Sequence, residues 1–181
     1  MKKMKIVFVL VAFILTLSIA VGSSLAWLTD KTDSVTNTFT YGDINIDLTE
    51  SENLDLKMIP GSNITKDPKV TVKANSEACW LFVKIEKSAN FDTFMTYTIA
   101  EGWKELDGVD GVYYREVEAS ETAKEFDVIK DNTVTVKDNV TKDMFTKDGY
   151  TAPTLTFTAY AVQSENVDDA ATAWGYANPT T

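Results

Sequence analysis

The sequence predicts an all-β protein: a jelly-roll-like β-sandwich with one or two short helices, preceded by a cleavable signal peptide. Three observations lead to this prediction. Apolar and polar residues alternate along several short runs, as they do in strands with one buried face. Turn-forming residues separate these runs at short spacing, without the strand–helix–strand rhythm of a parallel sheet. The chain also begins with a basic stretch and then an apolar one, which is typical of an exported protein.

The first 26 residues have the three parts of a signal peptide. Residues 1–5 are basic, residues 6–21 are almost entirely apolar, and small residues follow. Ser24 and Ala26 stand where a signal peptidase requires small side chains, so we expect cleavage between Ala26 and Trp27. An uncleaved transmembrane anchor is the alternative interpretation, because about 20 apolar residues can span a bilayer.

Strand patterns occupy much of the chain after the signal peptide. In the clearest of them we expect Leu81, Val83, Leu155 and Phe157 to face the core, because alternate side chains of a strand point to the same face. The clear runs are 44–48, 70–74, 79–86 and 155–161. Weaker runs are 97–99, 112–117, 126–128 and 133–136.

Two segments, 138–147 and 166–176, have the composition of short helices. We therefore divide the chain into a signal peptide (1–26), an extended N-terminal segment (27–40) and a sandwich domain (41–181). Pro-Gly and Asp-Gly pairs mark turns at 60–61, 107–108, 110–111 and 148–149.

The segment 27–40 is rich in threonine and β-prone, but it precedes the first well-patterned strand. One interpretation is an N-terminal arm of the domain. The other is a strand donated to another subunit, since an extended segment can add to an exposed sheet edge. In that case alternate side chains such as Val35 and Phe39 would enter pockets of the acceptor and set the register.

Charge disfavours two classes of partner. Removing residues 1–26 leaves 14 of the 17 basic residues and all 27 acidic ones, a formal net charge of −13. Such a surface repels nucleic acid and anionic membranes, so we expect no nucleic-acid partner and no membrane contact after cleavage.

The junction 26–30 (AWLTD), the stretch 36–48 (TNTFTYGDINIDL) and the turn 58–62 (MIPGS) together resemble the TasA/camelysin family. The resemblance covers the signal peptide and roughly the first third of the mature chain, and 156–163 (TFTAYAVQ) extends it. The region 103–129 departs from the family pattern, which leaves a specialised binding function open.

The resemblance implies a jelly-roll sandwich that is secreted, processed by a SipW-type signal peptidase and assembled into fibres of the biofilm matrix of Gram-positive bacteria. Fibre-forming members pass an N-terminal strand into the neighbouring subunit, so it also implies that role for 27–40. We therefore expect a structural subunit that self-assembles into matrix fibres or pilus-like filaments. A monomeric cell-surface adhesion module for a glycan or host protein is the alternative.

Camelysin-like proteins carry a metalloprotease label, but the chain has no histidine. An H-E-x-x-H zinc site and a Ser-His-Asp triad are therefore impossible, and we expect neither enzymatic activity nor a cofactor. Calcium is the one metal that the acidic loops could bind, but no EF-hand loop is present and solvated loop acids are the default interpretation. The residues in question are Asp107, Asp110, Asp131, Glu165, Asp168 and Asp169.

The lone Cys79 lies in an apolar run, and we expect a buried, inert thiol; an intermolecular disulfide or a nucleophile are the alternatives. Trp80 and Phe82 point away from the Leu81 row, so a donated strand or a helix should cover them. A carbohydrate platform is the other interpretation of the aromatic residues. These residues are Trp80, Phe82, Trp103, Tyr113, Tyr114, Trp174 and Tyr176.

Overall fold

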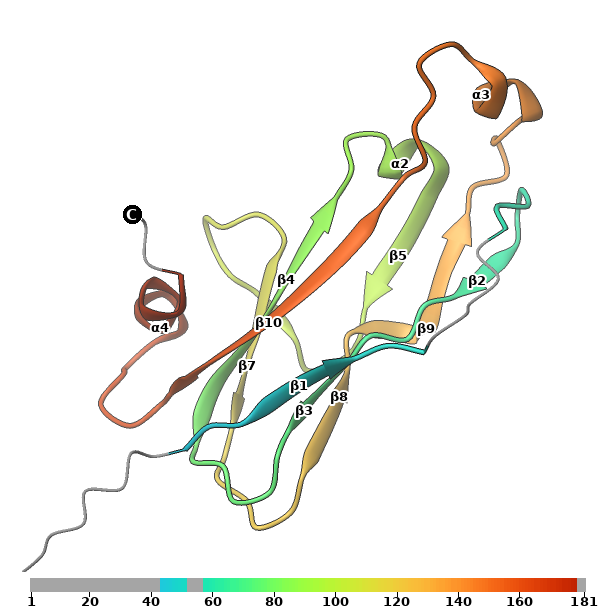
Figure 1. Ribbon diagram of the computed structural model, residues 1–181. Helices are drawn as coiled ribbons and strands as arrows, with labels where there is room; N and C mark the ends of the chain where they lie inside the picture. Colours follow the sequence, from blue (N-terminus) through green and yellow to red (C-terminus); the bar gives the residue numbers. More distant parts are fainter. Residues whose placement is uncertain (1–42, 52–56, 179–181) are drawn as a thin grey trace, which may run out of the picture. The chain divides into compact units, whose positions relative to one another are not determined.

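The computed structural model describes residues 43–51 and 57–178, all within one compact unit, Tyr41–Thr181. Ten strands and three short helices are found among these residues (Figure 1). The strands are β1 (Ile46–Thr49), β2 (Asn63–Thr65), β3 (Lys69–Val72), β4 (Cys79–Lys87), β5 (Met95–Ile99), β6 (Lys104–Glu105), β7 (Val112–Val117), β8 (Lys124–Asp127), β9 (Ile129–Val136) and β10 (Leu155–Gln163). The helices are α2 (Phe91–Phe94), α3 (Lys142–Thr146) and α4 (Ala170–Ala177).

The strands form three antiparallel sheets, with the orders β1-β3-β8, β10-β4-β7-β6 and β2-β9-β5. The first and third sheets are consecutive parts of one long strip, because β2 leads into β3 and β8 leads into β9. Two backbone hydrogen bonds continue the pairing across the junction: Val128 N donates to Pro68 O (3.0 Å) and Lys66 N donates to Asn132 O (2.9 Å). The chain thus passes repeatedly between this strip and the β10-β4-β7-β6 sheet, as in a jelly-roll-like sandwich.

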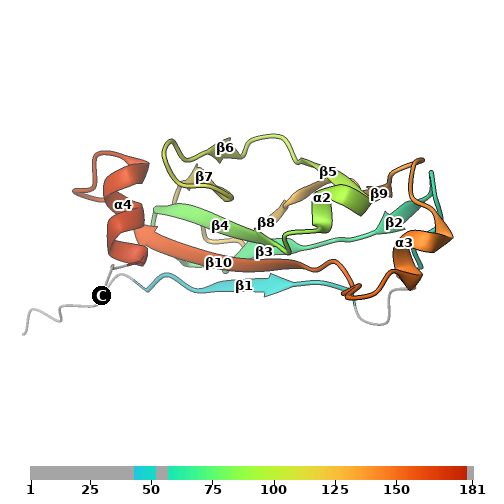
Figure 2. The ribbon, with the colours of Figure 1, turned by 90° about the horizontal axis from the view of Figure 1, so that it is seen from above.

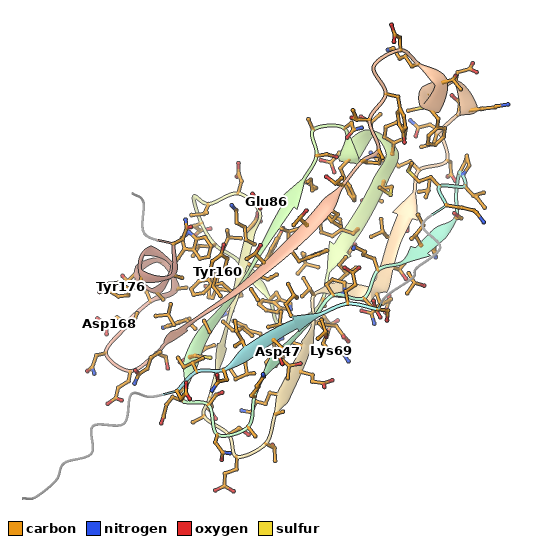
Figure 3. All side chains as sticks on the ribbon, in the orientation of Figure 1. Asp47, Lys69, Glu86, Tyr160, Asp168 and Tyr176 are labelled. Atoms are coloured by element: carbon orange, nitrogen blue, oxygen red, sulfur yellow. The ribbon has the colours of Figure 1, made fainter. Side chains whose placement is uncertain are left out.

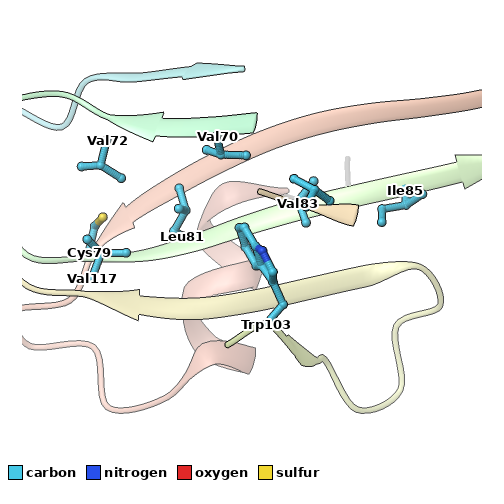
Figure 4. Close-up of a cluster of buried hydrophobic side chains, with 9 residues drawn as sticks. Val70, Val72, Cys79, Leu81, Val83, Ile85, Trp103 and Val117 are labelled. Carbon is cyan, nitrogen blue, oxygen red and sulfur yellow. The ribbon is translucent and has the colours of Figure 1, made fainter. Parts of the chain in front are cut away.

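The main apolar core lies between the strip and the β10-β4-β7-β6 sheet (Figure 4). Leu81 and Val83 are fully buried in it, and Leu155 and Phe157 pack against it as half-buried side chains. The inward orientation predicted for these four residues is confirmed. The buried members are Val70, Val72, Cys79, Leu81, Val83, Ile85, Trp103, Val117 and Val128.

A second cluster covers the outer face of β4, where α4 packs on the sheet. Phe82 is fully buried there, and its ring lies 5.3 Å from that of Trp174 on the helix. Tyr160 of β10 contacts the same indole edge-to-face at 5.1 Å. Of the two covers predicted for Trp80 and Phe82, the helix is the one found in the described structure.

A third cluster fills the other end of the sandwich, where α2 and α3 pack near β2, β5 and β9. Phe94 of α2 contacts Phe145 of α3 at 5.6 Å and Tyr150 at 5.9 Å. Figures 1 and 2 show α3 and α4 at opposite ends of the sandwich. Each end is therefore closed by its own helix and aromatic residues.

The sequence misplaced or missed several short elements. The helix predicted at 138–147 spans only Lys142–Thr146, because Thr141 caps its first turn. The helix predicted at 166–176 begins at Ala170, after the Asp169 side chain accepts a hydrogen bond from Thr172 N. Helix α2 and strands β2 and β6 were not predicted, since elements of two to four residues are too short for a periodic pattern.

Candidate functional site

Strand β10 is a long edge strand. It pairs with β4 over nine residues, from Leu155 opposite Lys87 to Gln163 opposite Cys79. No strand pairs with its other edge in residues 43–51 and 57–178, although β1 lies beside it (Figure 2). Its sequence, LTFTAYAVQ, contains no charged residue and no proline. Natural edge strands usually carry such residues to prevent pairing with other chains, so this edge lacks the common protection.

Two hollows lie along the N-terminal half of β10 and its lead-in. The larger has a volume of about 370 Å³ and the smaller about 280 Å³, and Leu155 lines both. We call the two together the β10 trough. The larger hollow is lined by Met58, Ile64, Lys66, Phe91, Met95, Val134, Ala152, Pro153, Thr154 and Leu155. The smaller is lined by Leu48, Thr49, Glu50, Pro68, Leu155, Thr156 and Phe157.

The β10 trough lies where edge strands of the three sheets meet. Ile64 comes from β2, the end strand of its sheet, and Leu155 comes from β10, the end strand of the facing sheet. Leu48, at the other end of the trough, belongs to β1, the end strand of the β1-β3-β8 sheet. The main core and the third cluster, at the α2 and α3 end, both reach the trough through Leu155 and Phe157. These two side chains are half-buried rather than buried. The trough is thus an incompletely covered part of the core.

One ion pair interrupts this apolar lining. Among the described residues, Lys66 and Glu50 are the only charged ones that line the β10 trough, and they pair with each other. The Lys66 Nζ atom also lies 5.5 Å from the centre of the Phe157 ring. Neither Lys66 nor Glu50 was predicted as a site residue, because an ion pair between residues distant in the chain leaves no periodic signal in the sequence.

Two hydrogen bonds from Ser51 to Asp67 fix the chain beside this pair. Ser51 N donates to Asp67 Oδ1 at 3.0 Å, and the Ser51 hydroxyl donates to the other carboxylate oxygen. The bond from the Ser51 hydroxyl, together with that from its backbone N–H, lowers the pKa of Asp67. The end of the β1 segment is thereby tied to the connection between β2 and β3 at the rim of the smaller hollow.

The residues predicted for cleavage, Ala26 and Trp27, lie outside the described residues. The same is true of Val35 and Phe39, which were predicted to enter an acceptor. The β10 trough was not predicted as a site, but Leu155 and Phe157 were assigned to the inward face of their strand, as observed.

The aromatic residues do not gather into one platform among the described parts of the chain. Trp103 is buried in the main core, and its Nε1 donates to Asp127 O at 2.8 Å. Trp80 belongs to the α4 cluster, and its Nε1 donates to Val167 O at 3.1 Å. Tyr176 is 67% exposed on α4 (Figure 3). Most of these side chains therefore serve packing.

The six acids considered for calcium lie in three places: two in the loop before β7, one in β9 and three in the loop before α4. Asp169 caps α4, where the backbone N–H of Thr172 lowers its pKa. Asp131 has a left-handed backbone, φ 55°, within β9. In the part of the chain that the structure describes, no three Cys, Asp or Glu residues are close enough to hold a metal ion.

Cys79 is fully buried, as predicted, and burial raises the pKa of its thiol to about 11. A thiol in this state is protonated at neutral pH and reacts slowly. An intermolecular disulfide through Cys79 would require the core to open.

Among residues 43–51 and 57–178, no helix has the length and apolar character needed to cross a bilayer. Comparisons of the chain with family models, with curated proteins and with solved structures found no match.

Proposed function

We propose that the chain is a secreted structural subunit that self-assembles into extracellular matrix fibres or pilus-like filaments. In this proposal, residues 27–40 of one copy form a strand that enters the β10 trough of the next copy. A SipW-type signal peptidase would release this segment by cutting between Ala26 and Trp27. The role is structural and requires no catalytic group or cofactor.

The observation that carries the proposal is the uncharged free edge of β10 beside an apolar trough. An edge of nine residues without charge or proline is a liability in a soluble monomer. If a strand from another copy covers it, the same feature becomes the basis of assembly. Backbone pairing would hold the donated strand, and alternate side chains would fill the hollows.

The length of the donor segment fits this role. It has 14 residues, which reach about 45 Å when extended at about 3.3 Å per residue. That is ample for the six residues of β10 and its lead-in that line the trough.

The order of events follows from the position of the segment. While residues 1–26 are attached, the donor strand is tethered to an apolar leader that the membrane or the export machinery holds. Cleavage after Ala26 would free it to enter a neighbour. Assembly would therefore begin only after export, which keeps the unprotected edge from pairing inside the cell.

The test compares mature protein beginning at Trp27 with protein beginning at Tyr41, by negative-stain electron microscopy and light scattering. We expect filaments from the first and folded monomers from the second, with circular dichroism confirming the fold of both. Within the longer protein, Phe39→Asp should reduce assembly strongly. Thr38→Asp is the matched control, because the same charge one residue away points to the opposite face of the strand.

Normal filaments from protein that lacks residues 27–40 would refute strand donation by this segment. If neither form makes filaments at high concentration, the monomeric adhesion module becomes the better interpretation. Equal effects of Phe39→Asp and Thr38→Asp would show that charge, and not the insertion of one strand face, controls assembly.

A further inference from the structure

The ion pair between Lys66 and Glu50 divides the β10 trough into two apolar parts. Lys66 lines the larger hollow and Glu50 lines the smaller one. The Lys66 ammonium also lies over the ring of Phe157, which lines the smaller hollow. A strand that runs along the trough must therefore pass over this pair between its two apolar contacts.

The pair is already partly withdrawn from water, since the side chains of Lys66 and Glu50 are 18% and 31% exposed. A strand laid over them would remove much of the water that remains. Desolvated charges are stable only when hydrogen bonds satisfy the rest of their donors and acceptors. An apolar side chain above the pair would supply none, whereas an amide can donate to the carboxylate and accept from the ammonium.

The trough therefore selects a pattern: an apolar side chain, then a polar one, then an apolar one on the same face of the strand. These are positions i, i+2 and i+4, with the outer two about 13 Å apart. Within residues 27–40 the large apolar residues are Trp27, Leu28, Val35 and Phe39. Only Val35 and Phe39 are four residues apart, and the residue midway between them is Asn37.

We infer that the Lys66–Glu50 pair sets the register of the donated strand by binding the Asn37 amide of the neighbouring copy. Phe39 then occupies the larger hollow and Val35 the smaller one, in keeping with the volumes of about 370 and 280 Å³. This inference rests on the proposed function and adds to it a positioning pair, a register and a strand direction. A shift of one residue would turn Thr36 and Thr38 toward the hollows and Asn37 away.

The experiment measures the critical concentration for filament formation by mature protein that begins at Trp27. Asn37→Leu should raise it about tenfold, because the pair is then covered without a hydrogen-bonding partner. Thr36→Leu is the matched control, since it adds an apolar side chain to the opposite face of the same strand; it should change the critical concentration less than threefold. Thermal unfolding checks that each variant keeps its fold.

The decisive variant combines Asn37→Leu with Glu50→Leu and Lys66→Met. With the pair replaced by apolar residues, leucine at position 37 should fit, and the critical concentration should return to within about threefold of the parent. If Glu50→Leu with Lys66→Met impairs folding, Glu50→Gln with Lys66→Gln replaces it. This neutral pair should tolerate Asn37→Leu better than the charged pair does, because neutral amides lose less on desolvation.

The inference is overturned if Asn37→Leu assembles like the parent, or if Thr36→Leu raises the critical concentration as much as Asn37→Leu does. It is also overturned if neither replacement of the pair restores assembly of Asn37→Leu. These results leave strand donation intact when protein beginning at Tyr41 still fails to assemble. By contrast, normal filaments from that shortened protein refute the proposed function itself, and the register with it.

Discussion

Strands β4 and β10 lie side by side, have nine residues each and pair in register over their whole length, yet their environments differ. In β4, Cys79, Leu81, Phe82 and Val83 are fully buried. In β10 no residue is buried. The cause is position in the sheet: β7 pairs with the other edge of β4, whereas β10 ends the sheet. Helix α4 packs on both strands and does not account for the difference.

Charged residues are usually found in edge strands rather than in central ones, but in this pair the distribution is the opposite. The central strand β4 ends in Lys84, Glu86 and Lys87, while the edge strand β10 has no charge at all. Elsewhere in the same fold, edge β1 pairs its Asp47 with Lys73, and edge β8 pairs Glu125 with Lys69 (Figure 3). Charge thus protects the edges β1 and β8, whereas β2, β5 and β10 carry no charged residue. Among the described strands β10 is the longest of these uncharged edges, as expected of an edge that another strand covers.

The largest expected effect tests the burial difference directly. Phe82→Ala should destabilise the monomer by about 3–5 kcal/mol, because the ring is fully buried against Trp174 and Tyr114. Phe157→Ala should cost only about 1.5–2.5 kcal/mol, because its ring is half-buried beside the trough. Urea midpoints with unchanged slopes measure both. Equal losses of stability in the two variants would contradict the difference in burial between β4 and β10.

The second prediction concerns the helix that covers β4. Trp174→Ala should destabilise the domain by about 3 kcal/mol, because its indole contacts Phe82 of β4 and Tyr160 of β10. Tyr176→Ala on the same helix is the control, and its exposed ring should matter little. Thermal unfolding distinguishes them. A small loss at Trp174 would mean that α4 is not what protects β4.

The third prediction adds the charge that β10 lacks. Thr156→Lys should change monomer stability by less than about 0.5 kcal/mol, since the side chain is exposed and lies opposite Glu86. It should nevertheless reduce filament formation, as edge lysines prevent strand addition. Thr71→Lys, on the central strand β3, adds the same charge between Asp47 and Glu125 and should leave assembly unchanged. Light scattering at equal protein concentration compares filament formation by the two variants and the parent.

The smallest effect concerns the rim of the trough. Ser51→Ala should raise the pKa of Asp67 toward its ordinary value, because two hydrogen bonds from Ser51 hold it down and one would be lost. A lowered carboxylate pKa adds stability above the unfolded-state pKa and loses it as the pH falls through the folded-state pKa. The variant should therefore lose slightly less stability than the parent on acidification. An NMR titration of Asp67 that is the same in both proteins would contradict the assignment.

Much of the fold could be read from the residues alone. The alternation in 79–86 predicted both the buried Leu81 row and an apolar second face at Trp80 and Phe82 that needed a cover. The short elements could not be read, because three residues such as 63–65 hold too few alternations to stand out from a loop. Of the candidate site, only the inward faces of Leu155 and Phe157 were foreseeable.

By itself the sequence determined the positions of the longer strands and which side of each is apolar, since this alternation is a local property of the chain. It also determined that histidine-dependent chemistry is impossible. Only the tertiary structure decided that β4 is central and β10 an edge, and that Lys66 meets Glu50 across the trough. The physical reason is that the order of strands in a sheet depends on hydrogen bonds between residues far apart in the chain, and period-2 alternation is the same in a central strand and in an edge strand.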